Sequence, residues 1–176
     1  MKKISTRKSN RSQRGSKKIR SVPYSLVVID MQRKFEAANS LQTIKAVKRL
    51  ILKAIQDNAH ICFAYFIKYG PTHRELTSLT RDYPNTSFVK AAQNDKSWSI
   101  LKRFRMDNIR PAFVKTCGVN TDACVYETTL GLGLKLPKSQ VLLIKPACNT
   151  YHNGLDYIGY RLSILQSENR NITVKF

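Results

Sequence analysis

Acidic residues are scarce in this chain. Its 176 residues include only 11 Asp and Glu against 31 Lys and Arg, so the formal net charge is +20 at pH 7. A balance this basic predicts acidic partners, and nucleic acid is one such class. Hydrophobic residues make up 42% of the chain and charged residues 24%, which is a globular composition. The length fits one domain whose core needs no disulfide or metal.

Long apolar runs are also missing. No stretch is long enough to span a bilayer, and no apolar stretch with a small-residue cleavage site follows the basic amino terminus. We therefore expect neither a membrane partner nor a secretory signal. The cysteines form no CxxC pair and no spacing typical of a zinc site, so we expect free thiols in a cytoplasmic protein: Cys62, Cys117, Cys124 and Cys148.

The amino-terminal segment differs in composition from the rest of the chain. Residues 1–21 carry nine Lys and Arg, no acidic residue, and only Ile4 and Ile19 as large apolar residues beyond the initiator. This is too little apolar surface to offset the entropy lost on ordering, so we predict a disordered basic arm over 1–21 and a folded domain over 22–176. The arm could neutralise phosphates of nucleic acid, with a solvated tail or a targeting segment as alternatives.

Beyond the arm, apolar strand-like runs alternate with segments of helical periodicity. We expect helices over 41–58, 98–106, 121–134 and 155–166, with Asp95 or Ser97 capping the second. We expect strands over 24–29, 61–67, 87–90, 112–118, 140–144 and 172–176. Alternating strands and helices, with strands that are apolar throughout, predict an α/β fold whose parallel sheet of five or six strands is covered by helices on both faces.

Polar residues follow three of these strands at their carboxyl ends, where ligands bind in such sheets. Asp30 closes the first strand, Lys90 the third, and the segment from Gly118 to Cys124 follows the fourth. A carboxylate after an apolar strand costs desolvation unless its charge is used, and a fixed ammonium would lower the pKa of a thiol. The alternatives are a turn or cap role for Asp30 and a solvated surface charge for Lys90.

Cys124 is the candidate nucleophile. Gly118 permits a tight turn, Thr121 can cap the next helix, and Cys124 then falls in the first turn, where the positive helix end favours a thiolate. The backbone amides of Asn120 and Cys124 are the expected donors to an oxyanion. The alternative is that Cys124 is a small core residue.

Three segments between residues 24 and 150 match known motifs in order. They are VVIDMQ at 27–32 with Phe35 after it, the lysine that ends the third strand, and GVNTDACVYETT at 118–129. They resemble the isochorismatase-like cysteine hydrolases, relatives of nicotinamidases and N-carbamoylsarcosine amidase. The resemblance implies a Rossmann-like parallel sheet, a triad of Asp30, Lys90 and Cys124, and a thio-acyl intermediate hydrolysed by water. It also implies a non-proline cis peptide near Val119 and Asn120, and a homo-oligomer.

The chain departs from the family after the triad lysine. The family usually shows K-x-x-x-S-A-F there, whereas Lys90 leads to Asn94, Asp95 and Lys96. The family's aromatic wall is missing from this position. Either Trp98 replaces it, or the pocket is different or closed. The candidates for the substrate pocket are Gln32, Phe35, Trp98 and Val119.

Metal ligands are sparse as well. Nicotinamidase-like members hold a metal through an Asp-x-His motif and a further His after the second strand, and this chain offers only His73 there. We interpret His60 and His73 as surface or loop residues and expect no metal and no other cofactor.

Two functions are compatible with these features. The first is hydrolysis of a small amide or related carbonyl substrate, with Cys124 attacking, Asp30 passing protons and Lys90 stabilising charge. The alternative is a catalytically altered relative that acts as a nucleic-acid-binding or ribonucleoprotein component through its basic arm and surface. Thiol reactivity and salt-sensitive nucleic-acid binding separate the two.

Overall fold

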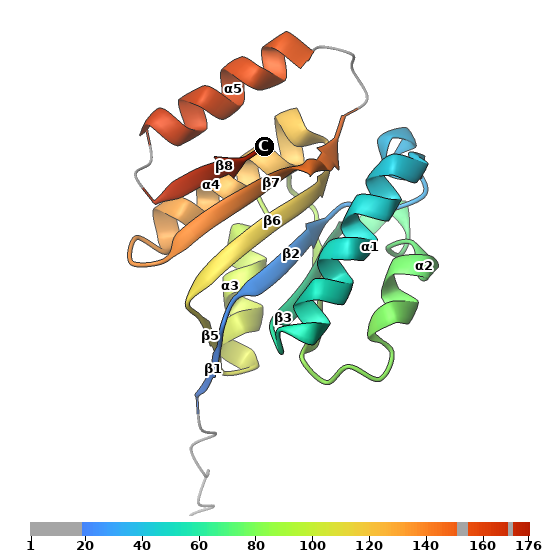
Figure 1. Ribbon diagram of the computed structural model, residues 1–176, viewed down its shortest axis with the longest axis vertical. Helices are drawn as coiled ribbons and strands as arrows, with labels where there is room; N and C mark the ends of the chain where they lie inside the picture. The colour runs from blue at the N-terminus through green and yellow to red at the C-terminus, as the bar shows by residue number, and fades with distance from the viewer. Residues whose placement is uncertain (1–18, 151–154, 169–170) are drawn as a thin grey trace, which may run out of the picture.

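A six-stranded parallel sheet forms the centre of the molecule (Figure 1). The computed structural model describes residues 19–150, 155–168 and 171–176. The strand order is β4-β3-β2-β6-β7-β8, and every neighbouring pair is parallel. This confirms the predicted α/β fold. The strands are β2 (Ser25–Ile29), β3 (His60–Phe66), β4 (Thr86–Ala91), β6 (Phe113–Val119), β7 (Gln140–Asn149) and β8 (Ile172–Lys175).

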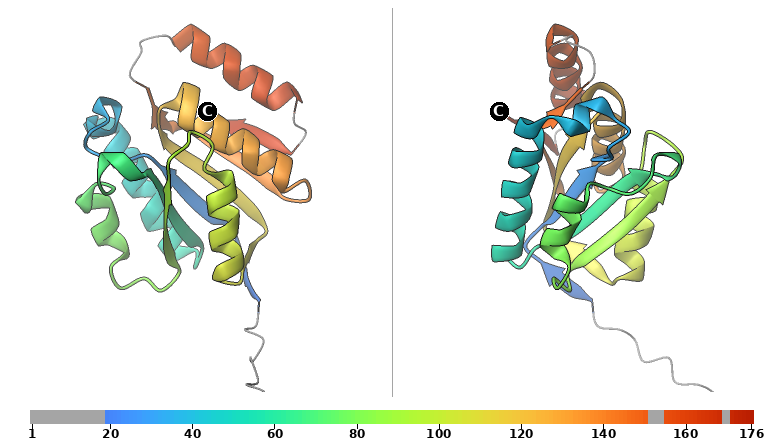
Figure 2. Two further views of the ribbon diagram at one scale, coloured as in Figure 1. Left: turned by 180° about the vertical axis from the view of Figure 1, so that it is seen from behind. Right: turned by 90° about the vertical axis from the view of Figure 1, so that its right-hand side faces the viewer.

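Helices cover both faces of this sheet, as the right-hand view of Figure 2 shows. One face packs against α1 (Leu41–Gln56) and the short α2 (Arg74–Thr77). The other face packs against α3 (Ser97–Met106), α4 (Tyr126–Lys135) and α5 (Leu155–Glu168). Two hydrophobic cores result, because alternate residues of each central strand point to opposite faces. Short 3-10 turns connect these elements at Glu36–Asn39, Ile67–Tyr69 and Ser78–Thr80.

The start of the folded chain pairs with a distant segment. β1 (Arg20–Val22) runs parallel to β5 (Ile109–Pro111) in a separate two-stranded sheet that the sequence patterns did not predict. Residues 20 and 21 of the predicted arm therefore lie in a strand, and residues 1–18 of that arm lie outside the described residues. No helix in the described ranges is both long enough and apolar enough to cross a membrane.

The end of β6 turns sharply into the next helix. Gly118 has φ +132°, and a Cβ at this position would overlap the carbonyl oxygen of Ile29 in β2, so only glycine fits. Asn120 follows with a left-handed backbone at φ 59°, and a π-helical turn at Thr121–Val125 precedes α4. The predicted continuous helix from residue 121 thus begins with a wider turn. The expected cis peptide near Val119 and Asn120 is wrong, because the described residues contain no cis bond.

Candidate active site

A buried ion pair lies at the carboxyl end of β2. Asp30 follows that strand with φ 53°, an uncommon backbone conformation for a residue other than glycine, and its side chain has no solvent exposure. Lys96 is equally buried, and its Nζ lies 2.9 Å from Asp30 Oδ2. The ammonium also donates to the carbonyl oxygens of Gln93 at 3.2 Å and Asn94 at 3.4 Å. Three acceptors therefore compensate the burial of this charge.

The lysine at this position corrects the predicted triad. Lys90 lies on β4 with an exposed side chain, and the structure does not bring it to Asp30. Side chains alternate along a strand, and Val89 beside it points into the core, so Lys90 points away from it. The chain then passes through residues 92–95, and the next lysine, Lys96, enters the core just before α3 and meets the carboxylate.

Cys124 lies in the π-helical turn and is 4% exposed. Its Sγ donates to Asn94 Oδ1 at 3.5 Å. The pKa of the thiol is raised to about 12, first by burial and second by the negative charge of Asp30, while the charge of Lys96 acts in the opposite direction. The expected stabilised thiolate is therefore not found, because desolvation outweighs the favourable helix end and the nearby ammonium.

The carboxylate is arranged to receive a proton. Burial raises the pKa of Asp30, and the charge of Lys96 acts in the opposite direction. Oδ2 accepts from Lys96, whereas Oδ1 has no hydrogen-bond partner among the described residues. An ionised buried carboxylate with one free oxygen is an effective acceptor for the proton of a neighbouring thiol.

The backbone amides next to Cys124 in the chain are hydrogen-bonded within the turn. The amides of Ala123 and Val125, on either side of Cys124, both donate to the carbonyl oxygen of Asn120, at 3.0 and 3.1 Å. Thr121 does not cap the helix as expected, because its hydroxyl donates to the carbonyl oxygen of Asn149 in β7 at 2.8 Å. The turn is thereby fixed to the sheet. Asn120 and Cys124 both border the adjoining cavity, so their amides remain our proposed oxyanion donors.

A small cavity of about 290 Å³ opens above Cys124. Three aromatic residues form one part of its wall, and Tyr69 contacts the rings of both Phe35 and Phe66, with centroids 4.9 and 5.5 Å apart. Asp30 and Lys96 are fully buried and are not among its lining residues. The lining consists of Phe35, Phe66, Tyr69, Asn94, Asn120, Asp122, Ala123, Cys124 and Thr150.

The four predicted pocket residues lie in different places. Phe35 borders the cavity. Gln32 is buried, where its side chain donates to the carbonyl oxygen of Phe66 and accepts from its amide, both at 2.9 Å, so it supports the aromatic wall from behind. Val119 is packed in the core. Trp98 is 65% exposed on α3 and is not among the residues that line the cavity.

Besides Thr150, four residues of the site were not predicted from the sequence. Phe66 and Tyr69 come at the end of β3, and Asn94 and Lys96 follow β4. All four lie at the carboxyl edge of the sheet, so the rule that located Asp30 also applied to them. The aromatic wall is present, but Phe35 follows β2, and Phe66 and Tyr69 come from the end of β3 and the turn after it. None of the three comes from the segment after β4.

The interpretation of His60 and His73 as surface or loop residues holds for one of them. His73 lies in the connection just before α2, although it is only 4% exposed, whereas His60 is a 1% exposed residue of β3 and corrects the expectation. His60 bridges two strands through hydrogen bonds with the hydroxyls of Ser25 at 2.8 Å and Ser87 at 3.0 Å. Within the described ranges, no cluster of three or more His, Cys, Asp or Glu could hold a metal ion.

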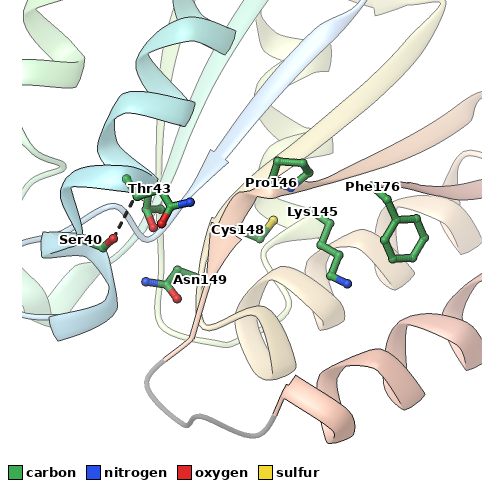
Figure 3. Close-up of a pocket in the computed structure, with 8 residues that line it drawn as sticks. Ser40, Thr43, Lys145, Pro146, Cys148, Asn149 and Phe176 are labelled. Carbon is green, nitrogen blue, oxygen red and sulfur yellow. Dashed lines mark hydrogen bonds between the residues drawn. The ribbon is translucent and has the colours of Figure 1, made fainter.

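A second cavity, of about 420 Å³, lies near the start of α1 (Figure 3). Lys145 and Cys148 of β7 line it, and the Lys145 ammonium lies 4.5 Å from the ring centroid of Phe176. Burial raises the pKa of Cys148 to about 12, and none of the lining residues is a carboxylate or histidine that could deprotonate it. This cavity therefore lacks the pairing of thiol and base found at Cys124.

Solved structures of known proteins share this fold. The nicotinamidase from Staphylococcus aureus has a TM-score of 0.69 at 17% identity, over 88% of this chain and 99% of its own. The N-carbamoylsarcosine amidase from Thermoplasma acidophilum has a TM-score of 0.63 at 14% identity, over 88% and 96%. The MAR1 ribonuclease from Caenorhabditis elegans has a TM-score of 0.69 at 18% identity, over 83% of this chain and 74% of its own. No protein-family model and no curated protein sequence matches the chain.

Proposed function

We propose, on the premise that the chain has the isochorismatase-like α/β fold, that it is a cysteine hydrolase acting on a small amide or related carbonyl compound. One observation supports this most strongly. The thiol of Cys124 borders a cavity and lies beside a fully buried carboxylate that is paired with an ammonium. Burying an ion pair costs desolvation that its mutual attraction need not repay, and proton transfer with Cys124 gives the charge of Asp30 a chemical use.

The first half of the reaction forms a thioester. The proton of the Cys124 thiol passes to Asp30, and Sγ attacks the carbonyl carbon of the substrate. The oxyanion that develops is held by the backbone amides of Asn120 and Cys124. When the intermediate collapses, the C–N bond breaks, and the amine leaves with the proton from Asp30. Because the pKa of the thiol is high, the proton transfer must accompany the attack.

The second half regenerates the enzyme. A water molecule gives a proton to Asp30 and attacks the thio-acyl carbon, and the carboxylic acid leaves as the C–S bond breaks and Sγ regains the proton. The balance is one amide and one water converted to one acid and one amine. Lys96 orients the carboxylate through both halves and favours its ionised form before each proton transfer, because Nζ is fixed by Oδ2 and by two carbonyl oxygens.

The shape of the cavity favours a small planar substrate. Its volume of about 290 Å³ suits a compact molecule, and Phe35, Phe66 and Tyr69 offer ring faces or edges to an unsaturated group. Asp122 also lines the cavity, and its Oδ1 accepts a hydrogen bond from the Thr150 hydroxyl at 2.6 Å. The similarity to a nicotinamidase and to N-carbamoylsarcosine amidase supports the same class of amide.

The direct test is release of ammonia from a panel of small primary amides that includes nicotinamide and N-carbamoylsarcosine. The purified chain should hydrolyse at least one of them, and Cys124→Ala should abolish that activity while Cys148→Ala retains it. Equal activity in the Cys124→Ala variant would contradict the proposal. Size-exclusion chromatography of the same preparation tests the proposed homo-oligomer, and the location of the tagged protein in cells tests the proposed cytoplasmic localisation.

A second proposed role is binding of nucleic acid. The net charge of +20 supports it, and so does the fold similarity to a MAR1 ribonuclease from Caenorhabditis elegans and to one from Leishmania major. Both roles are compatible in one chain, because the buried site at Cys124 does not use the surface charge. Salt-dependent binding of an RNA oligonucleotide by the full chain tests this role.

A further inference from the structure

A groove of about 680 Å³ lies at the amino ends of the strands, away from the cavity at Cys124. It is formed by the second half of α3, by β5 and by the connection from α4 to β7; the left-hand view of Figure 2 shows α3 and α4 side by side. Leu101, Phe104 and Ile109 are buried beneath it. The lining residues are Ser21, Leu101, Phe104, Arg105, Ile109, Arg110, Pro111, Ala112, Lys135, Leu136, Lys138 and Ser139.

The charges of this groove all have one sign. Four of its lining residues are basic and none is acidic. Lys135 is the exception in having a partner, because its Nζ lies 3.3 Å from Asp95 Oδ2. Arg105, Arg110 and Lys138 form no ion pair with the part of the chain that the structure describes. The fold thus holds three uncompensated cations around an apolar floor, which is complementary to a polyanion with apolar groups.

One face of α3 extends the basic surface with an aromatic residue. Trp98, Lys102 and Arg105 are spaced four and three residues apart, so they lie on the same side of the helix, and all three are exposed. The indole of Trp98 is 65% exposed, and the Lys135 ammonium lies 5.6 Å from its ring centroid. An exposed indole beside cations suits the stacking of an unpaired base.

The basic amino-terminal sequence joins the fold at this groove. Ser21 of β1 lines it, and residues 1–18, which precede β1 in the chain, contain eight further Lys and Arg and no acidic residue. In a single strand the bases are free to reach Trp98 and the apolar floor, whereas a duplex keeps its bases stacked inside. We propose that this groove and the α3 face bind single-stranded nucleic acid, with phosphates on Arg105, Arg110 and Lys138 and a base on Trp98. The inference rests on the second proposed role.

The test is fluorescence anisotropy of the full chain with a 12-nucleotide oligo-U RNA and the matching oligo-dT DNA over a salt series. The combined variant Arg105→Gln, Arg110→Gln and Lys138→Gln should weaken binding at least about tenfold and reduce the salt slope by about 2, because each lost single-strand phosphate contact contributes about 0.7. Trp98→Ala should weaken binding about tenfold, and Trp98→Phe should retain most of the affinity because the ring is kept. A similar loss with both oligonucleotides indicates recognition of the shared backbone, and a larger loss with RNA indicates contact with the 2′-hydroxyl.

A matched control removes three exposed charges from another face. Lys45→Gln, Arg49→Gln and Arg74→Gln, on α1 and α2, should change affinity less than about twofold. Equal losses in the control and groove variants would overturn the proposed site. So would loss of binding only when the Lys and Arg of residues 1–18 are replaced by Gln, or a groove effect on phosphatidylserine vesicles but not on RNA. If the unmodified chain binds no oligonucleotide, the second proposed role itself fails.

Discussion

Charged residues are arranged differently at the two ends of the parallel strands. At the carboxyl edge, Asp30 and Lys96 are both fully buried and neutralise each other 2.9 Å apart. At the amino edge, Arg105, Arg110 and Lys138 are exposed, carry the same sign, and have no ion-pair partner in the described ranges. Buried opposite charges shift the pKa values of their neighbours and suit proton transfer, whereas exposed like charges act at longer range on an ionic partner.

The two cavities near the carboxyl edge differ in whether a carboxylate lies near their cysteine. Cys124 is buried and Cys148 is partly buried, and burial is the main cause that raises the pKa of each thiol to about 12. Only Cys124 has a carboxylate among the groups that act on its pKa. A thiol that is protonated at neutral pH reacts as a nucleophile only when a base removes its proton. The presence of Asp30 near Cys124 is therefore the reason to propose the cavity at Cys124, and not the one at Cys148, as the active site.

The largest expected effect is on hydrolysis, and it distinguishes the two thiols. Cys124→Ala should lower hydrolysis of a responsive amide by at least about 10³-fold, because it removes the nucleophile. Cys148→Ala should stay within about twofold of the unmodified chain, because none of the residues that line the cavity at Cys148 is a carboxylate or histidine. Steady-state ammonia release measures both. A loss in the Cys148 variant comparable to that in the Cys124 variant would contradict the assignment.

The next effect compares two lysines near each other in the chain. Lys96→Met should lower the free energy of unfolding by about 3–5 kcal/mol, because Asp30 is left buried without its partner. Lys90→Met, at an exposed position of β4, should change it by less than about 0.5 kcal/mol. Chemical denaturation measures both values. The double variant Asp30→Asn with Lys96→Met should recover part of the loss, and the absence of any recovery would indicate that the ion pair is not responsible.

Backbone geometry at the site gives a third comparison. Gly118→Ala should destabilise the protein by about 3 kcal/mol, because φ is +132° and the new Cβ would overlap the carbonyl oxygen of Ile29. Gly70→Ala, at φ +80° with open space around it, should cost about 1 kcal/mol. Thermal unfolding followed by circular dichroism ranks the two. Equal losses would mean that the close approach of β6 to β2 is not the limiting factor.

The stability of the protein is expected to depend on pH through His60, which lies at the amino end of β3. Burial lowers the pKa of His60 to about 4, below its ordinary value of 6.5. As pH falls from 6.5 to 4, His60 becomes protonated in the unfolded chain but stays neutral in the folded chain. The free energy of unfolding therefore decreases by at most about 3 kcal/mol. His60→Gln should reduce this dependence, as measured by denaturant titrations at several pH values. An unchanged pH profile would assign the effect to other groups.

Much of the fold was readable from the sequence, since each main strand coincides with an apolar run and each long helix with an amphipathic pattern. Asp30 and Cys124 were found because both follow strands at the carboxyl edge. Lys96 was not, because it is delivered by a loop whose path depends on tertiary contacts such as the hydrogen bond from its amide to Thr128 Oγ1 at 3.1 Å. The pairing of β1 with β5 was missed for a similar reason: three-residue strands carry no periodic signal.

The most direct measurement is intact-mass and peptide analysis of the chain after brief exposure to p-nitrophenyl acetate. One acetyl group, carried by Cys124, is expected in the unmodified chain and in Lys90→Met. At most a trace is expected in folded Asp30→Asn, because the thiol keeps its proton without the carboxylate. Acetylation of Cys124 at the same rate in Asp30→Asn, or preferential acetylation of Cys148, would contradict the claim that Asp30, Lys96 and Cys124 act as one unit.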